Sequence, residues 1–312
     1  MTSWSTITVT KEKPEHVRAF VAWHLGAGAD EVILFYDDPN EDVTDFDHLP
    51  QVKVILGNSE YWDKNGGRLN SRSARQVHGA TLGYGMARTN WVLHCDTDEF
   101  VYGDNIAECL GEVSKQFATA QVLPVERVFL DGETNQSYSD TFRSPIRRKH
   151  AQKLNRIYKY PYQLTQGLRG HRNGKVFIRS GISDIIVRAH NAEIAGVLQN
   201  DPELRVTLND LKLLHIYTYG FDHFQTKGEW KFKRGSELRK RDAAIIDPTP
   251  TDTRRIEIAE IIEAGDIGKL NIIFNDSFVF PPERLERLAE IQEIQTFNFT
   301  SILQDRIQNY FP

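Results

Sequence analysis

The stretch that decides the fold is Trp91–Tyr102, WVLHCDTDEFVY, in which a short, largely apolar run leads directly into acidic residues. Residues 91–95 have the composition of a strand that is buried on both faces, as in a parallel sheet. Three acids then follow within four positions, at Asp96, Asp98 and Glu99. Because ligands of open α/β sheets bind beyond the carboxyl ends of the strands, this junction predicts a ligand site at a sheet edge.

The segments before this stretch alternate between strand and helix patterns. Strands are predicted at residues 4–10, 31–36 and 52–56, and helices are predicted at 14–25 and 74–84. After the acids, an apolar repeat at helical spacing predicts a helix that Asp104 caps and that reaches Phe117. This alternation predicts an α/β fold, a Rossmann-like three-layer sandwich around a mostly parallel central sheet.

Composition narrows the class of protein. The 312 residues carry a formal net charge of -5, which argues against a protein that binds nucleic acid by neutralising phosphates. The chain has two cysteines, no signal-peptide pattern and no apolar run of the roughly 18 residues that a membrane span needs. We therefore expect a cytoplasmic protein without a transmembrane segment, and a peripheral contact with the inner face of the membrane stays open.

The acidic cluster has a chemical interpretation and a simpler alternative. Carboxylates held this close repel one another, and a hard cation such as Mg²⁺ or Mn²⁺ relieves the repulsion while it bridges to diphosphate oxygens. The alternative is that the acids only solvate a turn. Their position after four strands of the buried type favours the cation site, because functional carboxylates concentrate at that edge.

Several motifs together carry a family resemblance over residues 4–240. They are Trp23-His24, Arg75-Gln76, Trp91 to Phe100, Gly174-Lys175, His190, and Leu214 to Tyr217. In these motifs the chain resembles the glycosyltransferases of the GT-A fold, specifically the family-2-like group that is related to family 92. The resemblance implies a metal-dependent hexosyltransferase that uses a nucleotide-sugar donor.

The resemblance also implies roles for the acids and for a later histidine. In such enzymes an Asp-X-Asp motif holds the metal together with the ribose and diphosphate of the donor, so Asp98 is expected to ligate the metal and Asp96 to contact the metal or the ribose. A histidine often completes the metal sphere. His215 fits that role better than His190, although a histidine after an apolar pair is also typical of a buried, hydrogen-bonded core residue.

Further donor contacts are expected at the second strand and at the helix before Trp91. Asp37 or Asp38 lies where this fold usually contacts the base and ribose, and the alternative for both is an Asx-turn before Pro39. Arg75 approaches the same edge and suits a diphosphate, since a guanidinium binds such oxygens in a bidentate way.

The resemblance implies inversion at the anomeric carbon, which requires a carboxylate as general base. Asp131, Glu133 and Asp184 are available, and Asp131 is favoured because it directly follows the predicted strand 125–130. The expected donor is a UDP- or GDP-sugar, and the expected acceptor is a glycan or polysaccharide. The donor would bind residues 1–130 and the acceptor residues 131–240, with residues 241–312 forming a helical C-terminal appendage.

Two other functions remain open from the sequence. Metal-bound carboxylates also serve nucleotidyl and phosphoryl transfer, although the chain contains no G-x-x-x-x-G-K-[ST] phosphate loop. A protein that binds nucleotide sugars without turnover is the other alternative, and the presence of Asp96, Asp98 and His215 argues against it.

Overall fold

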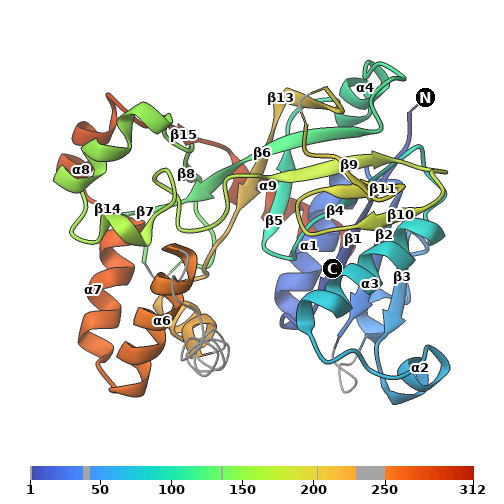
Figure 1. Ribbon diagram of the computed structural model, residues 1–312, viewed down its shortest axis with the longest axis horizontal. Coiled ribbons are helices and arrows are strands. Elements are labelled where there is room, and N and C mark those ends of the chain that lie inside the picture. Colours follow the sequence, from blue (N-terminus) through green and yellow to red (C-terminus); the bar gives the residue numbers. More distant parts are fainter. Residues whose placement is uncertain (1, 38–42, 135, 202, 230–249) are drawn as a thin grey trace. The chain divides into compact units, whose positions relative to one another are not determined.

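The computed structural model describes residues 2–37, 43–134, 136–201, 203–229 and 250–312 (Figure 1). They form two compact units. The first comprises Met1–Pro124, Asn173–His215 and Ser301–Pro312, and the second comprises Val125–Arg172 and Ile216–Thr300. These units are defined by packing, and the sequential division at residue 240 into a transferase domain and an appendage stays a prediction.

The first unit contains the strands and helices that position the acidic cluster. Its strands are β1 (Trp4–Thr10), β2 (Glu31–Tyr36), β3 (Val52–Leu56), β4 (Trp91–His94), β5 (Glu99–Tyr102), the start of β6 (Thr119–Arg127), β9 (Lys175–Arg179), β10 (Ile185–Val187), β11 (Ala192–Ile194), β12 (Val197–Leu198) and β13 (Arg205–His215). Its helices are α1 (Pro14–Gly26), η1 (Thr44–Phe46), α2 (Ser59–Lys64), α3 (Arg72–Met86), α4 (Ile106–Gly111) and the end of α9 (Phe299–Tyr310).

The central sheet of this unit is mostly parallel. Strands β3, β2, β1 and β4 lie side by side in that order and pair in parallel. Strand β9 pairs antiparallel with β4 and with β6, so β6 runs in the same direction as the four parallel strands. The predicted α/β fold with a mostly parallel central sheet is therefore confirmed.

Side chains alternate between the two faces of the sheet, and a separate apolar cluster covers each face. On one face Trp4, Val32 and Leu93 pack with Val17 and Phe20 of α1, and α4 and the C-terminal residues add to this cluster. On the other face Ile7, Ile33 and Val92 pack with Ala80 and Tyr84 of α3, together with strands β10 and β11. The three layers follow from the period of two in β-strands combined with amphipathic helices.

One predicted helix is shorter than expected. The structure begins α4 at Ile106, with Asn105 and not Asp104 as its N-cap, and ends it at Gly111. Asn105 has a left-handed backbone, with φ at 51°. The apolar repeat up to Phe117 still packs against the sheet, but a turn closed by the Phe117 amide and the Ser114 carbonyl replaces the last helical turns.

The second unit contains short strands and most of the C-terminal helices. Its elements are the end of β6, β7 (Phe129–Leu130), β8 (Thr141–Arg143), η2 (Arg148–Arg156), η3 (Pro161–Gln163), α6 (Pro250–Glu263), α7 (Ile267–Phe278), β14 (Val279–Phe280), α8 (Pro282–Leu288) and β15 (Ile294–Thr296). The sequence from Phe221 to Arg241 also predicts a helix. Residues 221–229 are helical, and the rest of that stretch lies outside the described residues.

The sequence between β8 and β9 predicts a long loop or insertion, and in the structure a buried carboxylate organises this irregular stretch within the second unit. The Glu126 side chain accepts hydrogen bonds from the Arg143 guanidinium and from the backbone amides of Arg169 and Gly170. Both side chains of the Glu126–Arg143 ion pair are fully buried. Such a pair is tolerated in the interior because hydrogen bonds satisfy its remaining polar groups.

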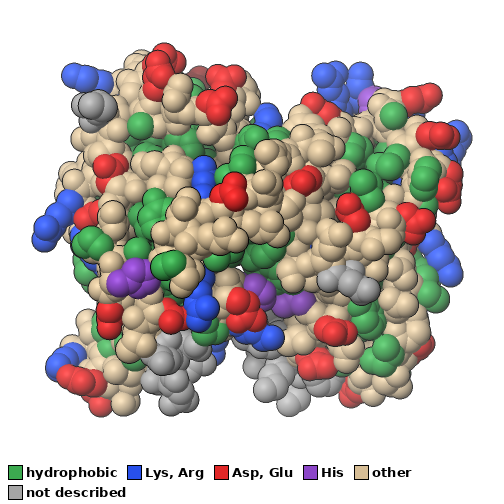
Figure 2. All heavy atoms as spheres, turned by 180° about the vertical axis from the view of Figure 1, so that it is seen from behind, with side chains coloured by type: hydrophobic (Ala, Val, Ile, Leu, Met, Phe, Trp, Pro, Cys, Tyr) green, Lys and Arg blue, Asp and Glu red, His purple; other side chains and the backbone are tan. Residues whose placement is uncertain are grey.

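Within the described part of the chain, no helix is both long and apolar enough to cross a membrane. Both cysteines are free thiols, Cys95 buried and Cys109 partly exposed. On the face drawn in Figure 2, acidic and basic side chains are interspersed.

Candidate functional site

Asp37 and the acidic cluster, both predicted to belong to the site, lie where the parallel strands of the first unit end. The register pairs Thr10 of β1 with Tyr36 of β2 and Ile7 of β1 with His94 of β4, so the residues after β2 and β4 leave the sheet at the same edge. Asp37 follows β2 and Asp96 follows β4. This is the carboxyl edge at which α/β sheets bind ligands.

Asp96 is held from two sides. The Gln76 side-chain amide of α3 donates to Asp96 Oδ1 over 2.7 Å, and Lys175 Nζ of β9 donates to Oδ2 over 2.8 Å. The Asp96 side chain is still 39% exposed, so a ligand can reach it. Burial would raise the pKa of Asp96, but the Lys175 ammonium outweighs that effect, and the pKa is lowered to about 2. Asp96 is therefore an oriented, ionised hydrogen-bond acceptor.

Glu99 is directed into the protein. Its side chain is fully buried. Glu99 Oε2 accepts a hydrogen bond of 2.8 Å from the Asp96 backbone amide and lies 3.2 Å from Lys175 Nζ. Burial would lower the pKa of Lys175, but the carboxylates of Asp96 and Glu99 raise it, so the ammonium stays charged. Asp96, Glu99 and Lys175 thus form an internal ion cluster beneath the exposed edge.

Asp98 lies on the side of the cluster that faces His215. Antiparallel pairing of β13 with β5 places His215 opposite Glu99. His215 Nε2 lies 4.0 Å from Asp98 Oδ2, and both side chains are largely buried, with exposed fractions of 8% and 13%. The ligand atoms of His215 and Glu99 lie within 4.8 Å of each other.

This donor set fits a divalent cation. Bonds of about 2.1 Å to one ion bring two neighbouring ligand atoms to about 3 Å from each other, so only a small side-chain movement separates Asp98 and His215 from that arrangement. An imidazole nitrogen is a common ligand of transition-metal ions, whereas magnesium takes oxygen ligands. Asp98 and His215, with Glu99 adjacent, are the residues that could hold such an ion.

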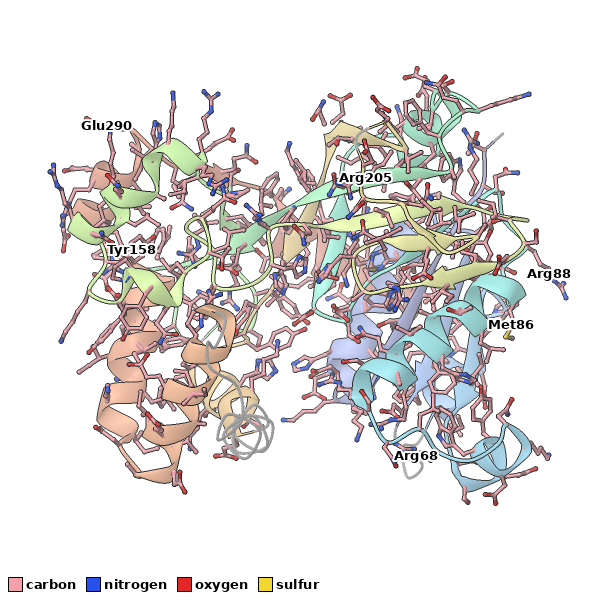
Figure 3. All side chains as sticks on the ribbon, in the orientation of Figure 1. Arg68, Met86, Arg88, Tyr158, Arg205 and Glu290 are labelled. Carbon is pink, nitrogen blue, oxygen red and sulfur yellow. The ribbon has the colours of Figure 1, made fainter. Side chains whose placement is uncertain are left out.

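Asp37 and Arg75, which were both expected to contact the donor, instead contact each other. Arg75 Nε lies 2.8 Å from each carboxylate oxygen of Asp37, and Arg68 donates to Asp37 Oδ1 over 2.6 Å. Arg68 extends from the loop that leads into α3 (Figure 3). The Asp37 side chain is only 3% exposed. Donor contact by either residue stays a prediction, and Asp38 lies outside the described residues.

The other expected residues lie elsewhere on the two units. Asp184 is exposed and has φ at 53°, directly before β10 of the first unit. Asp131 is exposed, directly follows β7 and belongs to the second unit. Glu133 belongs to the same unit, and its carboxylate accepts a hydrogen bond from the Leu130 backbone amide. His190 Nδ1 lies 3.0 Å from the Gly174 carbonyl oxygen. The choice of general base stays a prediction.

The structure adds roles for three residues to which the sequence assigned none, namely Gln76, Glu99 and Lys175. Glu99 was part of the predicted acidic cluster, whereas the sequence supplied no reason to connect Gln76 or Lys175 with that cluster. The sequence does show a glycine directly before Lys175. The structure explains it: Gly174 has φ at 63°, and a Cβ at this position would overlap the Val122 carbonyl oxygen. A lysine that begins a strand directly after such a glycine is held in one place by the backbone.

Comparisons with known proteins identify no family. No family model matches the chain, and no curated protein matches it. Among solved structures, a mycobacterial protein aligns over 66% of this chain and 66% of its own, with a TM-score of 0.34 and 9% identity. The glucosyl-3-phosphoglycerate synthase of Mycobacterium tuberculosis aligns over 66% of this chain and 69% of its own, with a TM-score of 0.34 and 7% identity.

A third solved structure, the galactosyltransferase LgtC in complex with donor and acceptor sugar analogues, aligns over 56% of this chain and 57% of its own, with a TM-score of 0.27 and 13% identity. The solved structure of 4-diphosphocytidyl-2C-methyl-D-erythritol synthase aligns over 42% of this chain and 65% of its own, with a TM-score of 0.28 and 13% identity. Likeness at this level carries no argument about function, which has to come from the site itself.

Proposed function

We propose that this chain is a metal-dependent glycosyltransferase, which moves a sugar from a nucleotide-diphosphate donor to a hydroxyl group of an acceptor. The observation that carries the proposal is the edge formed by Asp96, Asp98 and His215. There an oriented carboxylate lies beside a carboxylate and imidazole pair of metal-ligand type. A divalent cation in this place would neutralise charge on the departing nucleoside diphosphate.

The residues divide this work between them. Asp98 and His215 hold the cation, with Glu99 behind them. Asp96 accepts hydrogen bonds from hydroxyl groups of the donor ribose, because Gln76 and Lys175 already fix the direction of its two oxygens. The acceptor hydroxyl attacks the anomeric carbon, its proton passes to a carboxylate, for which Asp131 and Asp184 are the candidates, and the nucleoside diphosphate leaves with inversion.

The remaining expectations belong to the same proposal. The donor is a UDP- or GDP-sugar, the acceptor is a glycan or polysaccharide, and the ion is Mn²⁺ or Mg²⁺. The imidazole of His215 favours Mn²⁺ of these two. The relation to the family-2-like enzymes, the domain boundary at residue 240 and a cytoplasmic location are proposed together with it, and peripheral membrane contact stays open.

The first test is binding of nucleotides and metal, measured by thermal shift and calorimetry. UDP, GDP and their sugars are titrated with and without Mn²⁺, because a ligand that binds only the folded protein raises its melting temperature. We expect one nucleotide to bind only with Mn²⁺ present. Binding of CTP or ATP in place of both nucleotides would indicate nucleotidyl or phosphoryl transfer.

Asp98→Asn tests the cation site directly. The substitution keeps the shape of the side chain and removes the charge that a hard cation requires, so we expect Mn²⁺-dependent nucleotide binding to be lost while the protein stays folded. Asp305→Asn, at an exposed position of α9, is the matched control and should bind normally. Unchanged Mn²⁺ and nucleotide affinity in Asp98→Asn would disprove the site.

A further inference from the structure

Lys175 occupies an unusual place in the candidate site. It is a fully buried lysine, and three oxygen atoms surround its ammonium group: Asp96 Oδ2 at 2.8 Å, Ala189 O at 2.8 Å and Glu99 Oε2 at 3.2 Å. The ammonium donates hydrogen bonds to Asp96 and to the Ala189 carbonyl oxygen, and it forms an ion pair with Glu99. Oxygen atoms surround the ammonium as they would surround a bound metal ion, but the ammonium is part of the protein.

The backbone fixes where this ammonium lies. Strand β9 lies between β4 and β6, and the register pairs Lys175 with Val122 of β6. Gly174 precedes it in a left-handed conformation that lets the chain pass close to the Val122 carbonyl. The backbone thus fixes where the Lys175 side chain begins, and burial together with the hydrogen bonds to Asp96 and Ala189 holds the ammonium in place.

This ammonium lies between two of the three carboxylates of the cluster. Without it, Asp96, Asp98 and Glu99 would present three negative charges to an incoming cation. With it, one of those charges is neutralised before any metal arrives. A protein-bound ammonium at that point also leaves no room for a second metal ion between Asp96 and Glu99, which the paired ions of two-metal sites would need.

We propose that Lys175 is a positioning residue that acts as a built-in counterion: it holds Asp96 in its orientation, restricts the site to one divalent cation, and weakens the affinity for that cation. This inference rests on the proposed function, because it concerns the same cation. Its consequence is that the ion is held loosely without substrate and gains its remaining ligands from the diphosphate of the donor.

Lys175→Gln tests the inference, because glutamine keeps a hydrogen-bond donor and removes the charge. A unit charge about 6 Å from a divalent cation corresponds to about a tenfold change in affinity even at the dielectric constant of water. Calorimetric titration with MnCl₂, without nucleotide, should therefore show one Mn²⁺ per wild-type chain and binding that is at least about tenfold tighter in Lys175→Gln. A purely structural defect would weaken metal binding, so an increase in affinity separates the two explanations.

Lys53→Gln is the matched control. Lys53 of β3 also pairs with a carboxylate, Glu31, at 2.6 Å, but this pair lies near the amino-terminal ends of the strands and away from the acidic cluster. We expect its Mn²⁺ affinity to equal that of the wild type.

If the Lys175→Gln variant does not fold, the same substitution is tested in a variant that also carries Glu99→Gln. Glu99→Gln removes the charge of one of the two carboxylates that contact Lys175, so the same Lys175→Gln step is measured between Glu99→Gln and the double variant. We again expect tightening of about tenfold. Unchanged or weaker binding on this step, or two Mn²⁺ ions in the wild type, would overturn the inference, whereas a wild type that binds no Mn²⁺ would also remove the proposed metal-dependent function.

Discussion

At the residue scale, three neighbouring acids have three different environments. Asp96 is partly exposed between Gln76 and Lys175, Glu99 is buried against the same lysine, and Asp98 faces His215. The sequence shows only a cluster of like charges. Whether a carboxylate is available to a cation depends on whether a cationic or hydrogen-bonding side chain of the protein already contacts it.

Asp37 provides a prediction at this scale. Its nearly buried carboxylate receives Arg68 and Arg75, so Asp37→Asn leaves two guanidinium groups without their anion. We expect a loss of about 2–3 kcal/mol in the free energy of unfolding, as for other hydrogen bonds to buried charged groups. Urea denaturation followed by fluorescence measures it.

The control for Asp37 is an exposed pair of the same chemistry. Arg18 and Asp45 form an ion pair in which both side chains are 41% exposed. Asp45→Asn should cost less than about 1 kcal/mol, because solvent screens such pairs. Equal losses in the two variants would show that the Asp37 cluster stabilises the fold no more than a surface ion pair does.

At the element scale, the start of β9 has the strictest local requirement near the site. Gly174 combines a left-handed φ of 63° with backbone that a Cβ would overlap. Gly174→Ala must therefore displace β9 from β6 and carry Lys175 with it. We expect a loss of more than about 3 kcal/mol, the upper end for a single strained residue, because overlap adds to strain. Thermal and urea unfolding measure the loss.

Gly181 is the matched glycine, just after the end of the same strand. Its φ is 79°, yet nothing lies within 4 Å of the position of a Cβ. Gly181→Ala should therefore cost only the backbone strain, about 1 kcal/mol. If both variants lose the same stability, steric contact with Val122 is not what requires glycine at position 174.

At the scale of the whole molecule, two buried histidines make folding depend on pH. Burial lowers the pKa of His24 to about 3 and that of His94 to about 4, from an ordinary value of 6.5. Between pH 6.5 and 4 the unfolded chain therefore binds protons that the folded chain does not. The contribution of each histidine to the free energy of unfolding is fully present above pH 6.5. It is lost as the pH falls, by up to about 1.4 kcal/mol per pH unit.

His94→Asn tests this dependence. The Nδ1–H group of His94 donates to the Arg188 carbonyl over 3.1 Å, and an asparagine amide can donate in its place without titrating. We expect the free energy of unfolding, measured by urea denaturation at pH 7, 6, 5 and 4.5, to fall less steeply with decreasing pH in the variant. The difference in slope should correspond to the uptake of about one proton fewer on unfolding. A slope identical to that of the wild type would mean that His94 does not resist protonation in the folded state.

Much of the first unit follows from local sequence. The period-two strands, the helical repeat of α3 and the buried run 91–94 are all visible in short windows, since side-chain periodicity depends only on local backbone geometry. The same windows misplaced the end of α4, where the apolar repeat continues beyond Gly111 but packs from a turn. Periodicity predicts which face is buried more reliably than where a helix stops.

The sequence by itself determined that acids follow a buried strand at the ligand-binding edge of an α/β sheet. Only the tertiary structure decided which partner each acid meets, because Lys175 lies 79 positions from Asp96 along the chain, and Arg75 lies 38 positions from Asp37. The insertion of β9 beside β4 and the pairing of β13 with β5 bring those partners together. Electrostatic and metal-ligand interactions depend on separations of a few ångströms, and the packing of strands distant in sequence sets those separations.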